Sequence, residues 1–200
     1  MKKIRWAGLT AALALLMGLA TPALAPAQSV DAFLGFNTLV TGTSANGLPK
    51  LGGGLFMNAG GDIIFLPHNL GVGMQVAWRA KQELYAGAVV RPLYYDLNLV
   101  WQPVAPGSAI RPDFELGFGA QSLRFYTGTY QCSTFGGCSN YISSNHLMLH
   151  AAVGVKFYIT QHIFIRPALD FYNIRHNYEY GVPSAFQPGI SIGYTLGPSS

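Results

Sequence analysis

The sequence predicts an all-β fold in which eight antiparallel strands follow one another as an up-and-down meander. Apolar residues alternate with other residues at a period of two in eight segments, and turn-rich breaks separate these segments. Long polar loops alternate with short turns along most of the chain, as expected for neighbouring antiparallel strands. Beyond the N-terminus, no apolar run approaches the roughly 20 residues of a membrane-spanning helix.

Each segment carries its apolar residues on one face. The segments span residues 29–40, 53–65, 70–80, 89–101, 110–126, 146–157, 163–176 and 186–196. In chain order, aligned residues include Val30, Leu34 and Phe36; Leu70, Val72 and Met74; Leu93, Leu97 and Leu99; Phe114, Leu116 and Phe118; Leu147, Leu149 and Val153; Ile163, Ile165 and Leu169; and Phe186, Ile190 and Ile192. In the second segment, the Gly60–Gly61 pair predicts a bulge or bend.

The N-terminus has the build of a secretory signal peptide. Three basic residues, Lys2, Lys3 and Arg5, precede an uncharged apolar run and a small-residue exit. Cleavage after Ala27 is favoured, because the alternative site would leave a proline at the first mature position. An uncleaved anchor is the alternative, although the apolar run is short for a membrane span. We therefore expect a signal peptide at 1–27 and one domain at 28–200.

Charge is scarce in the rest of the chain. Removal of the signal leaves nine basic residues against eight acidic ones, which gives no reason to expect nucleic-acid binding. Charged residues make up 10% of the sequence, compared with about 25% in soluble domains, while half of the residues are hydrophobic. Such a chain must place apolar surface somewhere other than water.

The less apolar face of the strands decides between two kinds of barrel. This face is rich in glycine and small residues and carries about one charge per strand, for example Asp96, Glu115 and Lys156. It would make a poor surface for a soluble lipocalin-like barrel, but it suits the narrow lumen of a membrane barrel. Aromatic residues near the ends of the apolar face fit interfacial girdles; they are Phe36, Trp78, Trp101, Phe157 and Tyr194. Since an even number of strands leaves no edge in lipid, the sequence predicts a closed antiparallel eight-stranded transmembrane β-barrel.

The segment QPGISIGY, residues 187–194, resembles the terminal assembly signal of such barrels through Gln187, Gly189, Ile192 and Tyr194. With the strand pattern, it makes the chain similar to the small eight-stranded bacterial outer-membrane barrels, the group of the OmpA transmembrane domain, OmpX and OmpW. Many members of the group end on an aromatic residue, whereas TLGPSS follows here. The resemblance implies a porin-like monomer in the outer membrane of a Gram-negative cell envelope, with both termini in the periplasm. Its partners would be outer-membrane lipids, lipopolysaccharide, the barrel assembly machinery and an extracellular ligand at the loops.

The strand pattern predicts a network of charges in the barrel interior. Its members are Arg79, Asp96, Glu115, Lys156, Arg166 and Asp170, with Asp31 near the periplasmic end. Three bases therefore face four acids, and they must pair because an unpaired buried charge is costly. We expect a packed polar interior and a structural or surface-interaction role. A narrow or gated channel for small solutes is the alternative.

Two cysteines, Cys132 and Cys138, lie in a glycine-rich loop and predict a disulfide in an oxidising compartment. Metal binding or a redox pair are the alternatives, but no supporting residues lie nearby. The surrounding loop is aromatic and rich in Ser and Thr, like surfaces that bind proteins or glycans.

Catalytic chemistry finds little support. His146 and His150 share a strand face, but four strand residues span about 13 Å, too far for one metal ion. Lipid A deacylases with a barrel fold carry an H-x-S pair, and no histidine of this chain has Ser two positions later. We therefore expect no enzyme and no cofactor, with a lipid-modifying barrel enzyme as the remote alternative.

Overall fold

The structure, a computed structural model, describes residues 29–41, 52–79, 82–84, 88–133, 137–176 and 183–197. The expected signal peptide at 1–27 lies outside the described residues. No helix long and apolar enough to cross a membrane occurs in the described part of the chain.

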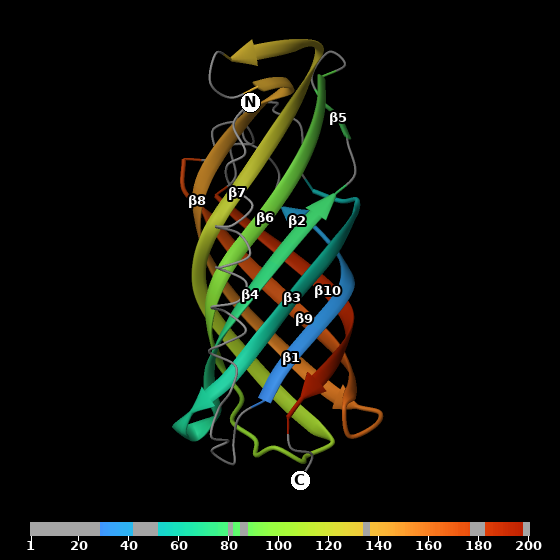
Figure 1. Cartoon of the computed structure of the whole chain (residues 1–200), viewed down its shortest axis with the longest axis vertical. Helices are drawn as coiled ribbons and strands as arrows, with labels where there is room; N and C mark the ends of the chain where they lie inside the picture. The colour runs from blue at the N-terminus through green and yellow to red at the C-terminus, as the bar shows by residue number, and fades with distance from the viewer. Residues whose placement is uncertain are drawn as a thin grey trace, which may run out of the picture.

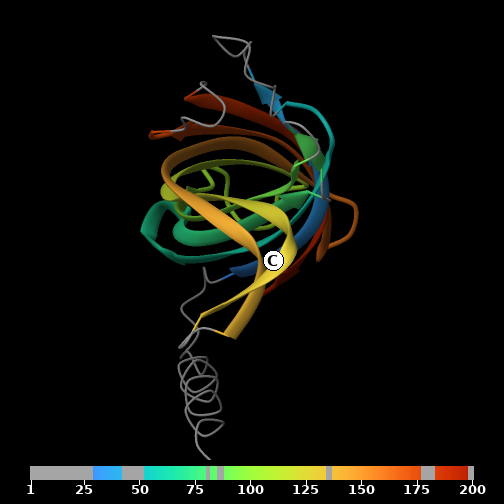
Figure 2. The same ribbon diagram turned by 90° about the horizontal axis from the view of Figure 1, so that it is seen from above.

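Eight long strands of the described chain form a closed, tilted ring (Figures 1 and 2). They are β1 (Ser29–Thr38), β3 (Leu55–Leu66), β4 (Leu70–Arg79), β6 (Ala88–Trp101), β7 (Ile110–Ser133), β8 (Gly137–Tyr158), β9 (Ile163–Ile174) and β10 (Ser184–Leu196). Each pairs antiparallel with the next, and β1 closes the ring on β10 from Val30 opposite Leu196 to Asn37 opposite Gly189. The predicted all-β antiparallel meander is confirmed.

Three short elements complete the described fold. β2 (Val40–Thr41) follows β1 and pairs with β10, whereas β5 (Gln82–Leu84) pairs with β6. The 3₁₀ turn η2 (Pro67–Asn69) connects β3 to β4. His68 and Asn69 have φ values of 62° and 57° there, so the chain reverses within three residues.

The two ends of the barrel differ. One end, here called the turn end, holds Ser29, Leu196, η2 and the connections at 102–109 and 159–162 (Figure 1). The other, the loop end, carries the hairpin of β7 and β8. Successive connections along the chain thus lie alternately at the two opposite ends of the barrel.

The β7–β8 hairpin is longer than the sequence pattern predicted. The predicted strands end at residue 126 and resume at residue 146, with a cysteine loop between them. Instead, pairing continues through Tyr126 opposite Tyr141 to Cys132 opposite Cys138. A disulfide joins the two cysteines, as expected. The hairpin therefore projects beyond the barrel as a two-stranded ribbon (Figure 1).

The predicted bulge at Gly60–Gly61 is wrong. Both glycines pair in continuous register with β1 and with β4, and the register shift lies between Ile64 and Leu66 instead. The close approach of neighbouring strands explains the glycine at position 60, because an added Cβ would lie 2.4 Å from the Phe33 ring.

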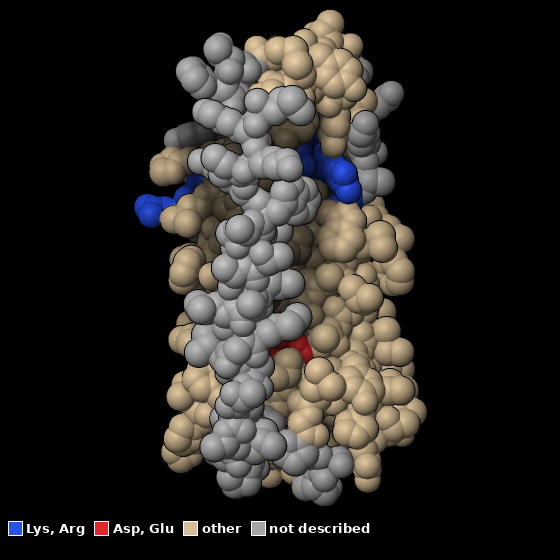
Figure 3. Space-filling view, viewed as in Figure 1, with Lys and Arg blue, Asp and Glu red and all other residues tan. Residues whose placement is uncertain are grey.

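Side-chain burial follows the predicted alternation. Outward residues are exposed and largely apolar, for example Leu34, Leu97, Leu116 and Ile192. On the face shown in Figure 3, the described wall consists mostly of residues other than Lys, Arg, Asp and Glu. Blue atoms gather near the loop end, and a small red patch lies lower down. Residues between the outward positions point into the barrel and are buried.

Candidate functional site: the filled interior of the barrel

The interior holds most of the acidic residues of the protein. The sequence contains eight Asp and Glu residues. Six of them are buried in the described part of the barrel: Asp31, Asp62, Asp96, Asp113, Glu115 and Asp170. Four bases are buried with them, Arg79, Arg111, Lys156 and Arg166. The predicted set of three bases and four acids is therefore incomplete, because Arg111, Asp62 and Asp113 are buried as well.

Lys156 on β8 forms the ion cluster nearest the turn end. Its Nζ lies 2.6 Å from Oδ2 of Asp31 on β1 and 2.9 Å from Oδ2 of Asp62 on β3. The ring of Phe164 packs beside it, with its centroid 5.3 Å from Nζ. Since the ammonium is fully buried between two carboxylates, it joins three strands through the lumen.

Arg166 on β9 forms the next cluster toward the loop end. Its Nε donates to Oδ2 of Asp113 at 2.9 Å, and Nη2 donates to both Asp113 and Glu115 on β7. Gly154 on β8 makes room for this contact, because an added Cβ would lie 2.8 Å from Arg166 Nε and from Asp113 Oδ1. The guanidinium carbon lies 5.1 Å from the centroid of the Phe33 ring. The small residues on the inward face therefore leave space for long charged side chains.

His150 links the second cluster to a third group. Asn98 Nδ2 donates to Asp96 Oδ1 at 2.7 Å and to Glu115 Oε2 at 3.0 Å. This fixes Asn98 Oδ1 as an acceptor facing His150 Nδ1, at 2.8 Å. His150 Nε2 lies 3.1 Å from Asp170 Oδ1. Both ring nitrogens therefore face oxygen atoms, so the imidazole bridges Asn98 on β6 and Asp170 on β9.

We expect His150→Phe to lower the free energy of unfolding by about 3 kcal/mol, since the change removes the hydrogen bond to Asn98 Oδ1 and one of the two donors to the buried Asp170 Oδ1 while keeping an aromatic ring. Urea unfolding of the barrel in detergent micelles measures this value. Met148→Leu, a volume-conserving change on the same strand face, serves as the matched control and should cost less than about 1.5 kcal/mol. Equal stability of the two variants would contradict the role given to the His150 hydrogen bonds.

An apolar layer fills the interior on the loop-end side of His150. The Tyr172 ring stacks on His150 at 4.9 Å and on Tyr94 at 5.2 Å between centroids. Phe56 packs against Tyr94 at 5.8 Å. Buried aliphatic residues complete the layer; they are Leu39, Ala77, Val90, Leu123, Met148, Ile174 and Ala185. The expected polar interior is therefore only part of the filling, because aromatic and aliphatic side chains occupy the interior near the loop end.

The structure buries all six residues of the predicted charge network but does not bring all of them together. Asp96, Glu115, Arg166 and Asp170 lie in the chain of contacts around Asn98 and His150, and Lys156 lies in the neighbouring cluster. Arg79 lies near the loop end, where Nη1 donates to the Gly53 carbonyl and the guanidinium carbon is 5.0 Å from the Phe56 ring centroid.

Sequence reasoning missed two acids of these clusters, Asp62 and Asp113. Asp62 follows the Gly60–Gly61 pair. A bulge at that pair would have made it impossible to say whether Asp62 points inward or outward. The continuous register places Asp62 inside the barrel, together with Asn58. Asp113 follows Pro112 near a predicted strand end, yet it is two residues from the inward Glu115. Strict alternation along both strands would have found them.

The residues of the proposed assembly signal divide between the two faces of β10. Gln187 is buried and accepts a hydrogen bond from Asn37 Nδ2 at 2.9 Å, and Gly189 pairs with Asn37 of β1. Ile192 and Tyr194 point outward and are exposed. All four residues therefore lie on β10, the strand that pairs with β1 to close the barrel.

No group of three or more His, Cys, Asp or Glu side chains in the described residues is arranged to hold a metal ion. His146, part-buried, lies 3.0 Å from Ser144 Oγ through Nε2, while His150 is held in the interior.

Comparisons with known proteins agree on the architecture. No protein family model matches the sequence, and no curated protein sequence matches it. Among solved structures, Ail of Yersinia pestis, in complex with the heparin analogue sucrose octasulfate, is similar with a TM-score of 0.56 and 14% identity, over 85% of this chain and 99% of Ail. OprG of Pseudomonas aeruginosa has a TM-score of 0.55 and 15% identity, over 86% of this chain and 98% of OprG. The N-terminal β-barrel domain of Pseudomonas aeruginosa OprF has a TM-score of 0.55 and 13% identity, over 85% and 98% of the two chains. The chain thus has the fold of the small outer-membrane β-barrels, which confirms the resemblance at the level of fold.

Proposed function

We propose that the protein is an outer-membrane β-barrel with a closed interior that acts through its outer surface, in a structural or surface-interaction role. One observation carries this proposal: ion clusters and an apolar layer fill the described interior from the turn end to the loop end. A filled interior leaves the wall and the two ends as the surfaces available for function.

The outward face supports the membrane location. It exposes a continuous set of large apolar side chains around the ring, which water would not tolerate as a surface of this extent. Lipid on the outside and buried charges inside is the arrangement of transmembrane barrels. The proposal includes cleavage of residues 1–27, a domain at 28–200, a monomeric state and periplasmic termini at the turn end. Outer-membrane lipids and lipopolysaccharide would surround the wall.

The proposal also covers how the barrel is assembled in the membrane. The barrel assembly machinery would recognise the segment that contains Gln187, Gly189, Ile192 and Tyr194 on β10, the strand that pairs with β1 to close the ring.

The β7–β8 hairpin is the proposed interaction surface. Tyr130 is 74% exposed and lies beyond the last pair of β7 with β6, whereas Ile142 is 54% exposed and lies opposite Phe125, next to the end of that pairing. Arg124 packs over the Tyr141 ring at 5.1 Å on the same hairpin. Aromatic side chains on a rigid ribbon suit binding of a protein or a glycan. Ail was crystallised with a heparin analogue, which makes a sulfated glycan one probe to include for this chain.

The alternative functions find less support. A solute channel would need an open path, and the clusters around Lys156 and Arg166 occupy the lumen together with the apolar layer. For a lipid-modifying enzyme, His150 is buried in the interior, and the contact between Ser144 Oγ and His146 Nε2 at 3.0 Å has the order S-x-H rather than H-x-S.

Two epitope insertions in cells test the location and the orientation. One tag is placed between Cys132 and Cys138, and the other between Ala105 and Pro106 at the turn end. Antibody should label intact cells only for the hairpin tag, and both tagged proteins should fractionate with the outer membrane as heat-modifiable bands. Labelling of the turn-end tag alone would reverse the orientation, and recovery outside the outer membrane would overturn the location.

A defined array of glycans and extracellular matrix proteins tests the interaction surface. The wild-type barrel should bind at least one class of probe, and Tyr130→Ser combined with Ile142→Ser should lose that binding while the heat-dependent gel shift is retained. Absence of binding by the wild type, or equal binding by both proteins, would count against the hairpin as the functional surface.

A further inference from the structure

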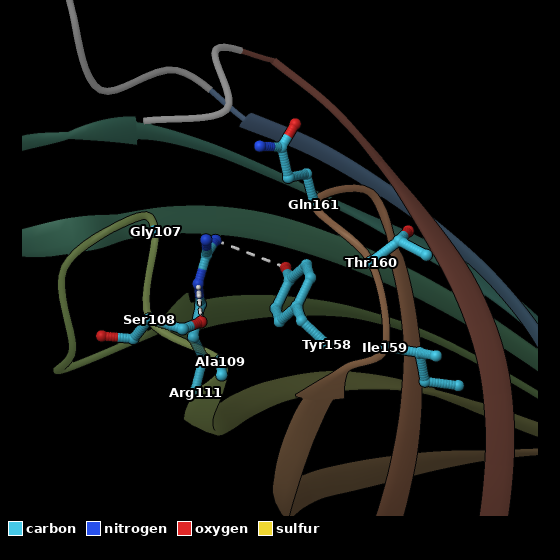
Figure 4. Close-up of a pocket in the computed structure, with 8 residues that line it drawn as sticks. All are labelled: Gly107, Ser108, Ala109, Arg111, Tyr158, Ile159, Thr160 and Gln161. Carbon is cyan, nitrogen blue, oxygen red and sulfur yellow. Dashed lines mark hydrogen bonds between the residues drawn. The ribbon is translucent and has the colours of Figure 1, made fainter.

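A cavity of about 310 Å³ opens at the turn end. Two neighbouring connections form it, the one before β7 and the one between β8 and β9 (Figure 4). Gly107, Ser108 and Ala109 line one side, and Tyr158, Ile159, Thr160 and Gln161 line the other, with Arg111 between them. The guanidinium of Arg111 points between the two connections (Figure 4).

The side chain of Arg111 is held in a fixed position. Nε donates to the Ser108 carbonyl at 3.2 Å and Nη1 donates to the Tyr158 hydroxyl at 3.3 Å. The guanidinium carbon lies 4.3 Å from the Tyr158 ring centroid, and the Tyr158 hydroxyl is itself 2.9 Å from Thr195 Oγ1. An arginine with this support keeps its orientation without losing further side-chain entropy when a ligand binds.

Arg111 differs from the buried bases Lys156 and Arg166 because it has no carboxylate counter-ion among the described residues. Lys156 and Arg166 each contact two carboxylates, whereas no carboxylate of the described residues forms an ion pair with Arg111. Yet Arg111 is only 7% exposed. A guanidinium has five N–H donors, and the hydrogen bonds to Ser108 and Tyr158 occupy two of them. A guanidinium that is buried beside a cavity, with no carboxylate of the described residues within ion-pair distance, favours binding of an anion.

Thr160 lies on the opposite connection, with its side chain directed away from Arg111 (Figure 4). Thr160 Oγ1 accepts hydrogen bonds from the backbone N–H groups of His162 and Ile163, at 3.3 and 3.0 Å. These two hydrogen bonds hold the connection between β8 and β9 in shape on this side of the cavity. The exposed Gln161 amide stands at the rim (Figure 4).

We propose that this cavity binds a small oxyanion group, a carboxylate or a phosphate, paired with the Arg111 guanidinium between the two connections. The cavity lies at the small end of the roughly 300–1,000 Å³ range of ligand pockets, so it accepts an end group rather than a polymer segment. The terminal carboxylate of a short peptide and inorganic phosphate are the two sources with this chemistry.

Isothermal titration of the full barrel in zwitterionic detergent micelles tests the proposal with two probes, acetyl-D-alanyl-D-alanine and inorganic phosphate. At least one probe should bind saturably and more weakly as salt is raised, and Arg111→Gln should weaken that binding at least tenfold. Arg91→Gln, a part-buried arginine on β6 near the loop end, is the matched control and should leave affinity within twofold. Binding of the peptide alone or of phosphate alone identifies the source.

Two additional variants separate binding from folding. Tyr158→Phe keeps the ring beneath the guanidinium and should weaken binding less than Arg111→Gln does. Thr160→Val removes a hydroxyl that is held by its own turn, so it should change affinity less than Arg111→Gln does while the heat-dependent gel shift is retained. Saturation by neither probe, or equal affinity of wild type and a folded Arg111→Gln, would overturn the proposal.

Discussion

Replacement of Arg166 by Met is expected to lower the free energy of unfolding by about 3–5 kcal/mol, the cost of removing one partner from a buried ion cluster. The guanidinium is 1% exposed and contacts both Asp113 and Glu115, so its loss leaves two carboxylates in the lumen without their counter-ion. Urea unfolding in detergent micelles, followed by tryptophan fluorescence and checked by the gel shift, measures the difference.

Two variants make the Arg166 result specific. Arg91→Met removes a part-buried arginine near the loop end and should cost less than about 1 kcal/mol. Adding Asp113→Asn and Glu115→Gln to Arg166→Met should restore more than half of the lost stability, because the neutral side chains no longer need a cation. If Arg166→Met unfolds like the wild type, the ion cluster does not hold the barrel together.

Leu97→Arg is expected to lower the free energy of unfolding in lipid vesicles by about 2–4 kcal/mol, the cost of an arginine on the lipid face near the bilayer midplane. Leu97 lies on the outward face of β6 and is 57% exposed. Tyr130→Arg is the matched control: this residue is more exposed, but it lies on the hairpin beyond the barrel, and the change should have little effect.

The Leu97 result distinguishes the two barrel types. In a soluble barrel, an arginine at an exposed outward position would be neutral or would improve solubility. A Leu97→Arg protein that stays folded and monomeric without detergent would therefore contradict the membrane assignment.

Much of the fold could be predicted from the sequence because a strand has only two faces. The period of two placed Leu97 outside and Lys156 inside. The glycine-rich, charge-poor composition of the less apolar face indicated that this face lies in the lumen and that the apolar face meets lipid. Alternation failed where a glycine pair or a proline was taken as an interruption, and this is why Asp62 and Asp113 were missed. The length of the β7–β8 hairpin was underestimated because its polar residues lack the apolar pattern that a lipid-facing strand requires.

The partners within the interior could not be predicted in the same way. Lys156 pairs with Asp31, which is 125 positions away in the sequence. Such a contact depends on the stagger of strands around the closed ring, which the alternation of one strand does not contain. The cavity beside Arg111 could not be predicted from one strand either, since it forms only where two connections of the chain meet. The apolar layer around Tyr94 and Tyr172 likewise depends on which inward residues of different strands share one level.

The central claim, a closed interior, is tested most directly by planar-bilayer conductance of the purified barrel. The gel shift and protease protection in the same preparation must show that folded protein is inserted. We expect no discrete current steps above the bare bilayer, because the ion clusters and the apolar layer fill the lumen. Reproducible unitary steps that change when Lys156 or Arg166 is neutralised would contradict it and would make the protein a channel.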